Sequence, residues 1–410
     1  MSDFISRRDV VKQGGLIALG LVAPKWLSSI AQADVLRTAR GGKVAKDTVL
    51  VVCQFSGGND GLNTVIPWAD NLYRQYRPTI GIPEDKIVKL DDHMGLHPSL
   101  APIGEMYKQG KVAIIQNVGY PNPNRSHFKS MDIWQSASPE STLKYGWIGR
   151  HMDQQMLTGP LNPVVALGLS TEKPMALAAK NASIPCFASL ADLQSMIGDS
   201  DAERMLREIQ GPDAPIGSNA RVVQQANKAA LDAISVLNAQ LKNYTVKQTY
   251  GTDAFGNGFK QISQLIATSP ATRVVYFSAG GFDTHAKQND TQEKLLGNFA
   301  NAVSAFQKEM EACGKADKVI VLVFSEFGRR VQENGSQGTD HGHGNVMFLI
   351  GNSVKGGLHG QKPDLANLTN GDLTMHIDFR EVYATTLDTW MGGDSEVVLA
   401  QKFNHLPVFS

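Results

Sequence analysis

Cysteine is scarce in this chain of 410 residues, which contains only Cys53, Cys186 and Cys313. No two of them form a Cys-x-x-Cys pair, so a zinc ribbon and a thioredoxin-type redox motif are both excluded. Cys53 lies within an apolar run, and we expect it to be a small buried hydrophobe. Spacing alone does not decide whether Cys186 and Cys313 form a disulfide.

The chain also lacks an excess of charge of either sign, because Lys plus Arg and Asp plus Glu number 39 each. Proteins that bind nucleic acids usually carry a basic surplus, so we expect no nucleic-acid partner. A hydrophobic content of 42% describes a globular protein, and the length is sufficient for a large core.

The N-terminal region has no apolar run long enough to span a bilayer well, because the segment from Gly14 to Pro24 is short and glycine-rich. This segment follows Arg7-Arg8 and precedes Ala31-Gln32-Ala33, a small-x-small site for a signal peptidase. The pattern is typical of a twin-arginine export signal, with an ordinary Sec signal or a membrane anchor as alternatives. We therefore expect residues 1–33 to be a signal peptide, the twin-arginine translocase to be a transient partner, and the location to be periplasmic or extracellular.

Runs of β-branched and aromatic residues alternate with amphipathic stretches along the rest of the chain. The predicted strands are 48–55, 112–118, 163–169, 273–278, 318–324 and 346–350. The main predicted helices are 98–109, 219–244, 291–312 and 378–390, with shorter ones at 147–152 and 201–210. A β-α-β order indicates parallel strands, so we expect an α/β fold with a largely parallel central sheet.

Residues that can bind metal ions follow several of these strands. Asp60 comes after the first strand, Asp283 and His285 after 273–278, and Glu326 after 318–324. Asp340 and His341 lie in a glycine-rich loop before the strand 346–350, where packing does not easily explain them. In an open α/β sheet, ligands bind where strands end, and carboxylate with imidazole is a usual ligand mix for a divalent ion such as zinc. For Asp60 alone, an Asn-Asp-Gly turn without chemistry is an equal alternative.

Ser126 is the candidate nucleophile, since it lies near the predicted start of a helix that continues through Ile133 and Trp134. The positive end of the helix dipole would favour an alkoxide or an anion there. The alternative is an ordinary N-cap, because serine is among the commonest capping residues.

With these motifs in place, the chain resembles the domain of unknown function 1501 family, in the alkaline-phosphatase-like superfamily that also holds sulfatases. The resemblance covers nearly all of the mature chain and lies in six segments: residues 57–63, 125–128, 280–285, 325–329, 340–342 and 378–385. It implies an alkaline-phosphatase-like fold with helices on both faces of the sheet. It also implies one domain over residues 34–410. Within it, the less regular pattern of residues 140–265 indicates a helical connecting and capping region.

The resemblance further implies an exported hydrolase of small anionic esters of phosphate or sulfate. One or two divalent ions, zinc first and manganese or calcium as alternatives, would be held by Asp60, Asp283, His285, Glu326 and His341, with Asp340 as a further ligand. Ser126 or a bound water would attack, Arg329 or Arg125 would neutralise the oxygens, and His127 or His343 would protonate the leaving group.

Two departures from the superfamily pattern qualify this expectation. Phe327 follows Glu326 where a histidine is usual, and Cys186 does not begin a Cys-x-Pro-x-Arg motif, which argues against a formylglycine sulfatase. The alternative function is therefore a non-catalytic binding or assembly protein on the same scaffold, with an unknown partner protein.

Overall fold

The computed structural model describes residues 47–157, 161–190, 215, positions 221, 224, 228, 231–233, 236, 237 and 241, and residues 244–409. The expected signal peptide and the helix expected at 201–210 lie outside these residues. Within the described ranges, no helix has the length and apolar character needed to cross a membrane.

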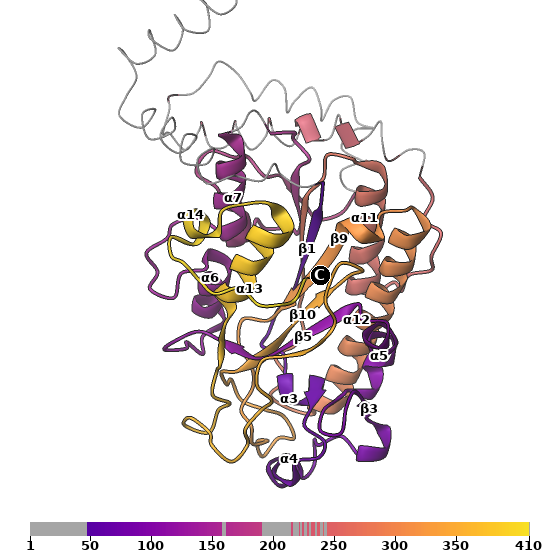
Figure 1. Ribbon diagram of the computed structural model, residues 1–410, viewed down its shortest axis with the longest axis vertical. Helices are drawn as coiled ribbons and strands as arrows, with labels where there is room; N and C mark the ends of the chain where they lie inside the picture. Colours follow the sequence, from indigo (N-terminus) through magenta and orange to yellow (C-terminus); the bar gives the residue numbers. More distant parts are fainter. Residues whose placement is uncertain are drawn as a thin grey trace, which may run out of the picture.

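A nine-stranded sheet runs through the molecule in the order β11-β5-β10-β9-β1-β8-β6-β7, with β12 paired to β5 (Figure 1). Its strands are β1 (Val49–Phe55), β5 (Val112–Gly119), β6 (Ala166–Leu169), β7 (Cys186–Phe187), β8 (Val274–Ala279), β9 (Val319–Phe324), β10 (Asn345–Ile350), β11 (Gly357–His359) and β12 (Ile377–Asp378). Among the named strands of this sheet, β10 alone runs antiparallel to its neighbours. The predicted α/β fold with a largely parallel sheet is therefore confirmed.

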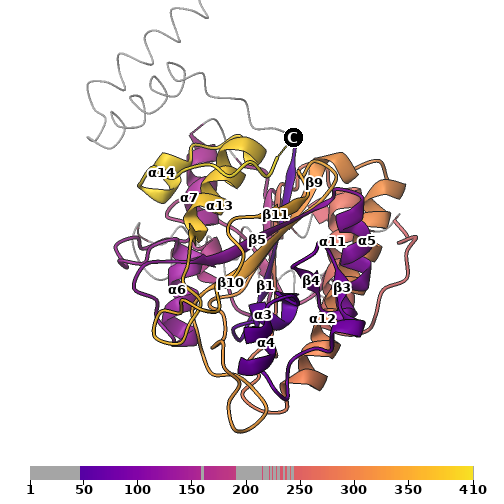
Figure 2. The same cartoon turned by 60° about the horizontal axis from the view of Figure 1, so that its bottom comes forward.

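Helices cover both faces of the sheet, as Figure 2 shows. Side chains of a strand point alternately to its two faces. Val51 and Cys53 of β1 accordingly join the core with α5 (Ala101–Lys108), α11 (Ala254–Thr268) and α12 (Gln288–Ala312). Leu50 and Val52 join the opposite core with α6 (His127–Ser136), α7 (Trp147–Met156) and α13 (Phe379–Thr385). The predicted burial of Cys53 is confirmed, and Cys186 and Cys313 are both free thiols.

The predicted helices that the structure describes are present, but their ends differ from the predicted ends. The helix expected at 98–109 starts as a 3-10 turn at Pro98–Leu100, and the one expected at 378–390 ends as a π-helical segment, η5 (Thr386–Met391). Short elements fill the loops: α3 (Gly61–Thr64), α4 (Asn71–Tyr76), α14 (Ser395–Leu399) and a small sheet of β2 (Val65–Ile66), β4 (Gly95–Leu96) and β3 (Val88–Lys89). Within 219–244, every described position from 221 to 241 is helical.

Residues 140–265, which we expected to form a helical connecting and capping region, also add strands to the main sheet. They supply β6 and β7, which lie beyond β8 at that end of the sheet, and α11, which covers one face.

The first two predicted strands, β1 and β5, run in the same direction but are not neighbours, because β9 and β10 lie between them.

The ends of β1, β8 and β9 lie side by side, with Phe55 opposite Ala279 and Gln54 opposite Phe324. The loops after these three strands therefore leave the sheet at one edge. Because β10 runs the other way, its first residue, Asn345, lies at this same edge opposite Val118 of β5. The loop before β10 thus meets the loops that follow the other strands.

Candidate metal centre

Three histidines and one aspartate converge at this edge of the sheet. Asp283 Oδ1 lies 3.0 Å from His285 Nε2 and 3.2 Å from His341 Nε2. Asp283 Oδ2 lies 3.4 Å from Nε2 of His127, the first residue of α6. His127, Asp283 and His341 can each direct one ligand atom at a common point, with all three atoms within 4.8 Å of one another.

Each histidine holds its other ring nitrogen against an oxygen acceptor. His127 Nδ1 lies 2.9 Å from Glu326 Oε1, and His285 Nδ1 lies 3.2 Å from Asp340 Oδ1. His341 Nδ1 lies 2.8 Å from the carbonyl oxygen of Arg125. A neutral ring with its proton on Nδ1 satisfies each of these acceptors, because carboxylates and carbonyls only accept hydrogen bonds. Nε2 then keeps its lone pair, which is the arrangement that metal-binding histidines usually show.

The spacing of these atoms fits a bound cation. The Nε2 atoms of His285 and His341 are 3.0 Å apart, a distance that a hydrogen bond spans when one ring carries its proton there and that a shared cation would span when neither does. Ligand atoms of a tetrahedral zinc ion, at about 2.0–2.1 Å from the metal, are separated by about 3.3 Å. His127 Nε2 is buried and makes no hydrogen bond in the structure. A polar atom in that position usually has a partner, and a metal ion would supply one.

Asp283 is kept ionised by a buried arginine. Partial burial acts to raise its pKa, but hydrogen bonds from Arg329 and His341 outweigh that effect and lower the pKa to about 2. Arg329 is fully buried and donates to Asp283 Oδ1 at 2.6 Å. It also donates to the carbonyl oxygens of Gly57, Gly58, Phe282 and Thr339. Arg329, predicted to be catalytic, is therefore enclosed by protein acceptors and contacts Asp283, whose ionised form it stabilises.

Glu326 and Asp340, both predicted as metal ligands, contact histidines instead. The buried carboxylate of Glu326 accepts from His127 Nδ1 and from the backbone N–H of Gly57. The hydrogen bond to Glu326 raises the pKa of His127. Asp340 is exposed, and a hydrogen bond from Asn334, followed by one from His285, lowers its pKa. In this geometry the two carboxylates orient the rings that bear the Nε2 atoms.

Asp60 lies outside the cluster. Both of its carboxylate oxygens accept from the buried Arg77, at 2.6 and 2.9 Å, and Oδ1 also caps α3 through the N–H of Leu62. Gln288 donates to Oδ2 as well. Both oxygens of Asp60 are thus occupied by N–H donors, so the structure gives no support for a second ion at Asp60.

The ring of Phe327 forms one wall of the centre. It packs against His127 and His341, with ring centroids 4.9 and 4.7 Å apart. Gly58 faces this ring with φ of +77°, and a Cβ there would lie 2.3 Å from it. Only glycine allows such an approach at a positive φ, which accounts for the glycine pair after β1.

Ser126 lies at the rim of the centre, and its neighbours on both sides touch the site. The carbonyl of Arg125 accepts from His341, and the ring of His127 faces Asp283. Ser126 occupies the N-cap position of α6, yet its side chain makes no capping hydrogen bond and is exposed to solvent. His343, by contrast, is outside the cluster, with Nε2 bonded to the carbonyl of Tyr120.

The structure thus brings together Asp283, His285 and His341, all predicted as ligands, and adds His127, predicted only as a proton donor. The missed signal is the position of His127 in the first turn of a helix that follows β5. That turn faces the same sheet edge as the loops after β8 and before β10.

The chain belongs to a protein family of unknown function, DUF1501, whose model matches residues 45–401. No curated protein matches the chain. One similar solved structure is a protein in the alkaline phosphatase superfamily from Vibrio parahaemolyticus, with 10% identity, 88% of this chain and 72% of that chain covered, and a TM-score of 0.38. A sulfatase from Pseudoalteromonas sp. has 9% identity, 94% and 75% coverage, and a TM-score of 0.39. The periplasmic domain of EptC from Escherichia coli, solved in complex with zinc, has 8% identity, 75% and 74% coverage, and a TM-score of 0.32.

Proposed function

We propose that this protein is an exported, metal-dependent hydrolase of phosphate or sulfate esters, with zinc as its ion. The observation that supports the proposal is the convergence of three histidine Nε2 atoms on Asp283, with each Nδ1 held by an oxygen acceptor. Imidazole nitrogen suits zinc, whereas calcium takes oxygen ligands, so this donor set favours zinc over calcium.

His127, Asp283, His285 and His341 would hold the ion. When bound, a zinc ion supplies Lewis acidity to an ester oxygen and stabilises negative charge that develops on it. Glu326 and Asp340 keep two of the imidazoles in the tautomer that leaves Nε2 free, and Arg329 keeps Asp283 ionised.

Ser126 is the proposed nucleophile. Its hydroxyl oxygen would form a bond to phosphorus or sulfur while the bond from that atom to the ester oxygen breaks, and the alcohol would leave with the proton that the hydroxyl gives up. Water would then attack the same atom of the seryl ester, which would release phosphate or sulfate and return the proton to Ser126. The N-terminal end of α6, which has ten residues, places a partial positive charge near Ser126 and lowers the energy of the developing alkoxide.

Arg125 is the proposed contact for the charged oxygens of the ester. Its carbonyl already touches His341, and its side chain is 40% exposed while it pairs with the nearly buried Asp372. Arg329, the other predicted arginine, is fully buried. A guanidinium matches the oxygens of phosphate or sulfate through two parallel hydrogen bonds.

The direct test of hydrolysis is to screen the purified zinc-loaded protein with aryl phosphates and aryl sulfates. Ser126→Ala should abolish a covalent seryl ester that mass spectrometry detects in the wild type after rapid acid quench, and should lower kcat while zinc stays bound. Turnover that continues unchanged in Ser126→Ala would rule out the serine and leave attack by water. No turnover of any ester by zinc-loaded wild type would contradict the hydrolase.

A non-catalytic metal-binding or assembly protein is the second candidate. It is favoured by the pairing of Asp60 with Arg77, which occupies both oxygens of that carboxylate, and by the full burial of Arg329 among carbonyl oxygens. Such a protein would bind zinc in the same metal centre but would hydrolyse no ester. It would bind its partner protein through the surface around that centre.

Export through the twin-arginine translocase is also part of the proposal, since this route carries folded proteins that already hold a metal ion. Replacing Arg7 and Arg8 by lysine should retain the protein in the cytoplasm. Fractionation of cells that produce the two forms tests it, and equal export of both would indicate another route.

A further inference from the structure

The proposed metal centre offers four protein ligands, His127, Asp283, His285 and His341. A zinc ion with a structural role is closed by four protein ligands, whereas a catalytic zinc ion has three and keeps its fourth position for water or substrate. The proposed hydrolase needs that position for an oxygen of the ester. With a four-coordinate ion, one of the four residues therefore has to give up its place when the ester binds.

The distances at the centre distinguish His285 from the other three residues. His127, Asp283 and His341 each place one ligand atom so that all three atoms lie within 4.8 Å of one another. His285 is outside this set, although its Nε2 lies 3.0 Å from Asp283 Oδ1 and 3.0 Å from His341 Nε2. The set of three is thus complete without His285, which joins it from one side.

Two residues of this set are held by charged groups inside the protein. Glu326 orients His127, and its carboxylate is fully buried. Arg329 holds Asp283, and its guanidinium is fully buried as well. A buried charged group that loses its partner is costly, because its charge is then uncompensated away from water. These contacts therefore hold His127 and Asp283 in place.

His341 is held by the backbone and by packing. Its Nδ1 lies 2.8 Å from the carbonyl oxygen of Arg125, and its ring packs against the buried ring of Phe327. A backbone bridge also pairs His341 with Arg329. The side chain of His341 is 22% exposed, against 28% for His127.

His285 is held only by groups that water reaches. Its side chain is 45% exposed, and the side chain of Asp340, which lies behind its ring, is 63% exposed. A contact between two groups of this kind contributes little to stability, because water replaces it when it breaks. The ring of His285 can therefore turn away from the centre without leaving a buried charged group unpaired.

We propose that His285 is the exchangeable ligand of the metal centre. It binds the ion in the resting protein and yields its place to an oxygen of the phosphate or sulfate group when the ester binds. The bond between His285 Nε2 and the ion breaks as the bond from that oxygen to the ion forms, and no proton or electron is transferred. This inference rests on the proposed metal-dependent hydrolase and adds a closed resting form to it.

Zinc-edge X-ray absorption of the folded, zinc-loaded protein tests the exchange directly, because it counts imidazole ligands. Inorganic phosphate is the probe. We expect three imidazoles in the wild type without phosphate and two with saturating phosphate. His285→Ala should show two imidazoles in both samples.

The affinity for phosphate gives a second measurement. If His285 leaves the ion in about a tenth of the wild-type molecules, phosphate should bind about tenfold more tightly to His285→Ala, because no ligand then has to be displaced. Calorimetry of the zinc-loaded proteins measures this ratio. His285→Ala should also keep one zinc ion per chain, whereas His341→Ala, purified in the same way and folded by circular dichroism, should lose it.

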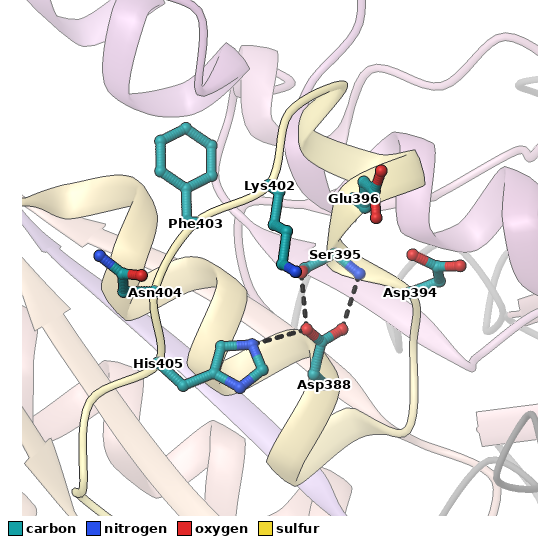
Figure 3. Close-up of a pocket in the computed structure, with 8 residues that line it drawn as sticks. All are labelled: Asp388, Asp394, Ser395, Glu396, Lys402, Phe403, Asn404 and His405. Carbon is teal, nitrogen blue, oxygen red and sulfur yellow. Dashed lines mark hydrogen bonds and ion pairs between the residues drawn. The ribbon is translucent and has the colours of Figure 1, made fainter. Parts of the chain in front are cut away.

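The matched control is His405→Ala. The side chain of His405 is 47% exposed, close to that of His285, and its Nε2 lies 2.8 Å from Asp388 (Figure 3). Asp388 belongs to η5, whose Trp390 donates to the carbonyl of Val49 at the amino end of β1, whereas the metal centre follows the carboxyl end of that strand. This variant should match the wild type in zinc content, imidazole count and phosphate affinity.

Three imidazoles in the phosphate-bound wild type would overturn the exchange. Equal phosphate affinity of the wild type and His285→Ala, or no phosphate binding by either, would overturn it too. So would loss of zinc from a folded His285→Ala, or zinc retained equally by His341→Ala. These results are independent of turnover: a wild type that exchanges an imidazole for phosphate but hydrolyses no ester would contradict the hydrolase and leave the exchange standing.

Discussion

His285 and His341 face each other with their Nε2 atoms 3.0 Å apart, although 56 residues separate them in the chain. Each ring is fixed from behind, His285 by Asp340 and His341 by the carbonyl of Arg125. When both rings carry their proton on Nδ1, their Nε2 lone pairs face each other, an arrangement that a cation between them would stabilise. The carboxylate of Asp283 beside both rings strengthens the attraction for such a cation.

The orientation of His127 by Glu326 gives the first prediction. Glu326→Gln keeps an oxygen that accepts from His127 Nδ1 but removes the negative charge that makes the ring a stronger ligand. We expect the affinity for zinc to fall about 10- to 100-fold, as is typical when such a supporting carboxylate is lost. Competition with a chromophoric chelator measures this affinity. The control is Glu333→Gln, at a carboxylate that binds backbone N–H groups of Thr79 and Ile80, and it should bind zinc as the wild type does. Unchanged affinity in Glu326→Gln would show that Glu326 has no such role.

The pairing of Asp60 with Arg77 gives the second prediction. Asp60→Ala leaves a buried guanidinium without its partner, which typically costs about 3–5 kcal/mol in the free energy of unfolding. The bound zinc should stay at the wild-type stoichiometry, because Asp60 does not face the metal centre. Urea denaturation and elemental analysis of the same sample measure both quantities. Asp70→Ala, which removes the cap of α4 at the surface, is the control and should cost only about 1 kcal/mol. Loss of zinc in a folded Asp60→Ala would restore Asp60 as a ligand.

The pH dependence of stability gives the third prediction, at a site remote from the metal centre. Burial lowers the pKa of His151 in α7 to about 4 from its ordinary value of 6.5. Between these two values the unfolded chain takes up a proton that the folded chain does not, so the free energy of unfolding falls as the pH drops through this window. The full effect of one such histidine is about 3 kcal/mol. His97, also buried, behaves in the same way.

His151→Leu should therefore reduce the loss of stability between pH 7 and pH 4.5 by about 2–3 kcal/mol, measured by urea denaturation at each pH. His93→Gln changes an exposed histidine and should leave the pH dependence as it is. A His151→Leu protein with the full wild-type pH dependence would show that burial of this ring does not couple folding to proton uptake.

The sheet and its reactive edge were predictable because they depend on local patterns. Continuous apolar runs predict buried strands, and the residues that follow parallel strands must meet at one edge. This reasoning places Asp283 and His285 near each other without knowledge of the strand order. His341 was predicted from the composition of its glycine-rich loop, and that loop reaches the same edge only because β10 runs antiparallel to its neighbours, which the sequence does not show.

The exact partner of each side chain was not predictable, because it depends on contacts distant in sequence. Arg77 reaches Asp60 from a loop after α4, and nothing in its neighbourhood marks it as buried. The sequence suggests that Arg329 binds substrate. In the fold, however, its guanidinium is surrounded by carbonyl oxygens from three different loops. Glu326, predicted as a metal ligand, and His127, predicted as a proton donor, are 199 residues apart in the chain, yet Nδ1 of the histidine lies 2.9 Å from the carboxylate.

The central claim is that His127, Asp283, His285 and His341 bind one metal ion. Elemental analysis of the folded protein, purified without chelator, tests it most directly when compared with the Asp283→Ala, His285→Ala double variant. We predict one zinc per wild-type chain and none in the variant, with unchanged circular dichroism. A wild-type protein that is folded, holds no metal and takes none up from added zinc, manganese or calcium would contradict the claim.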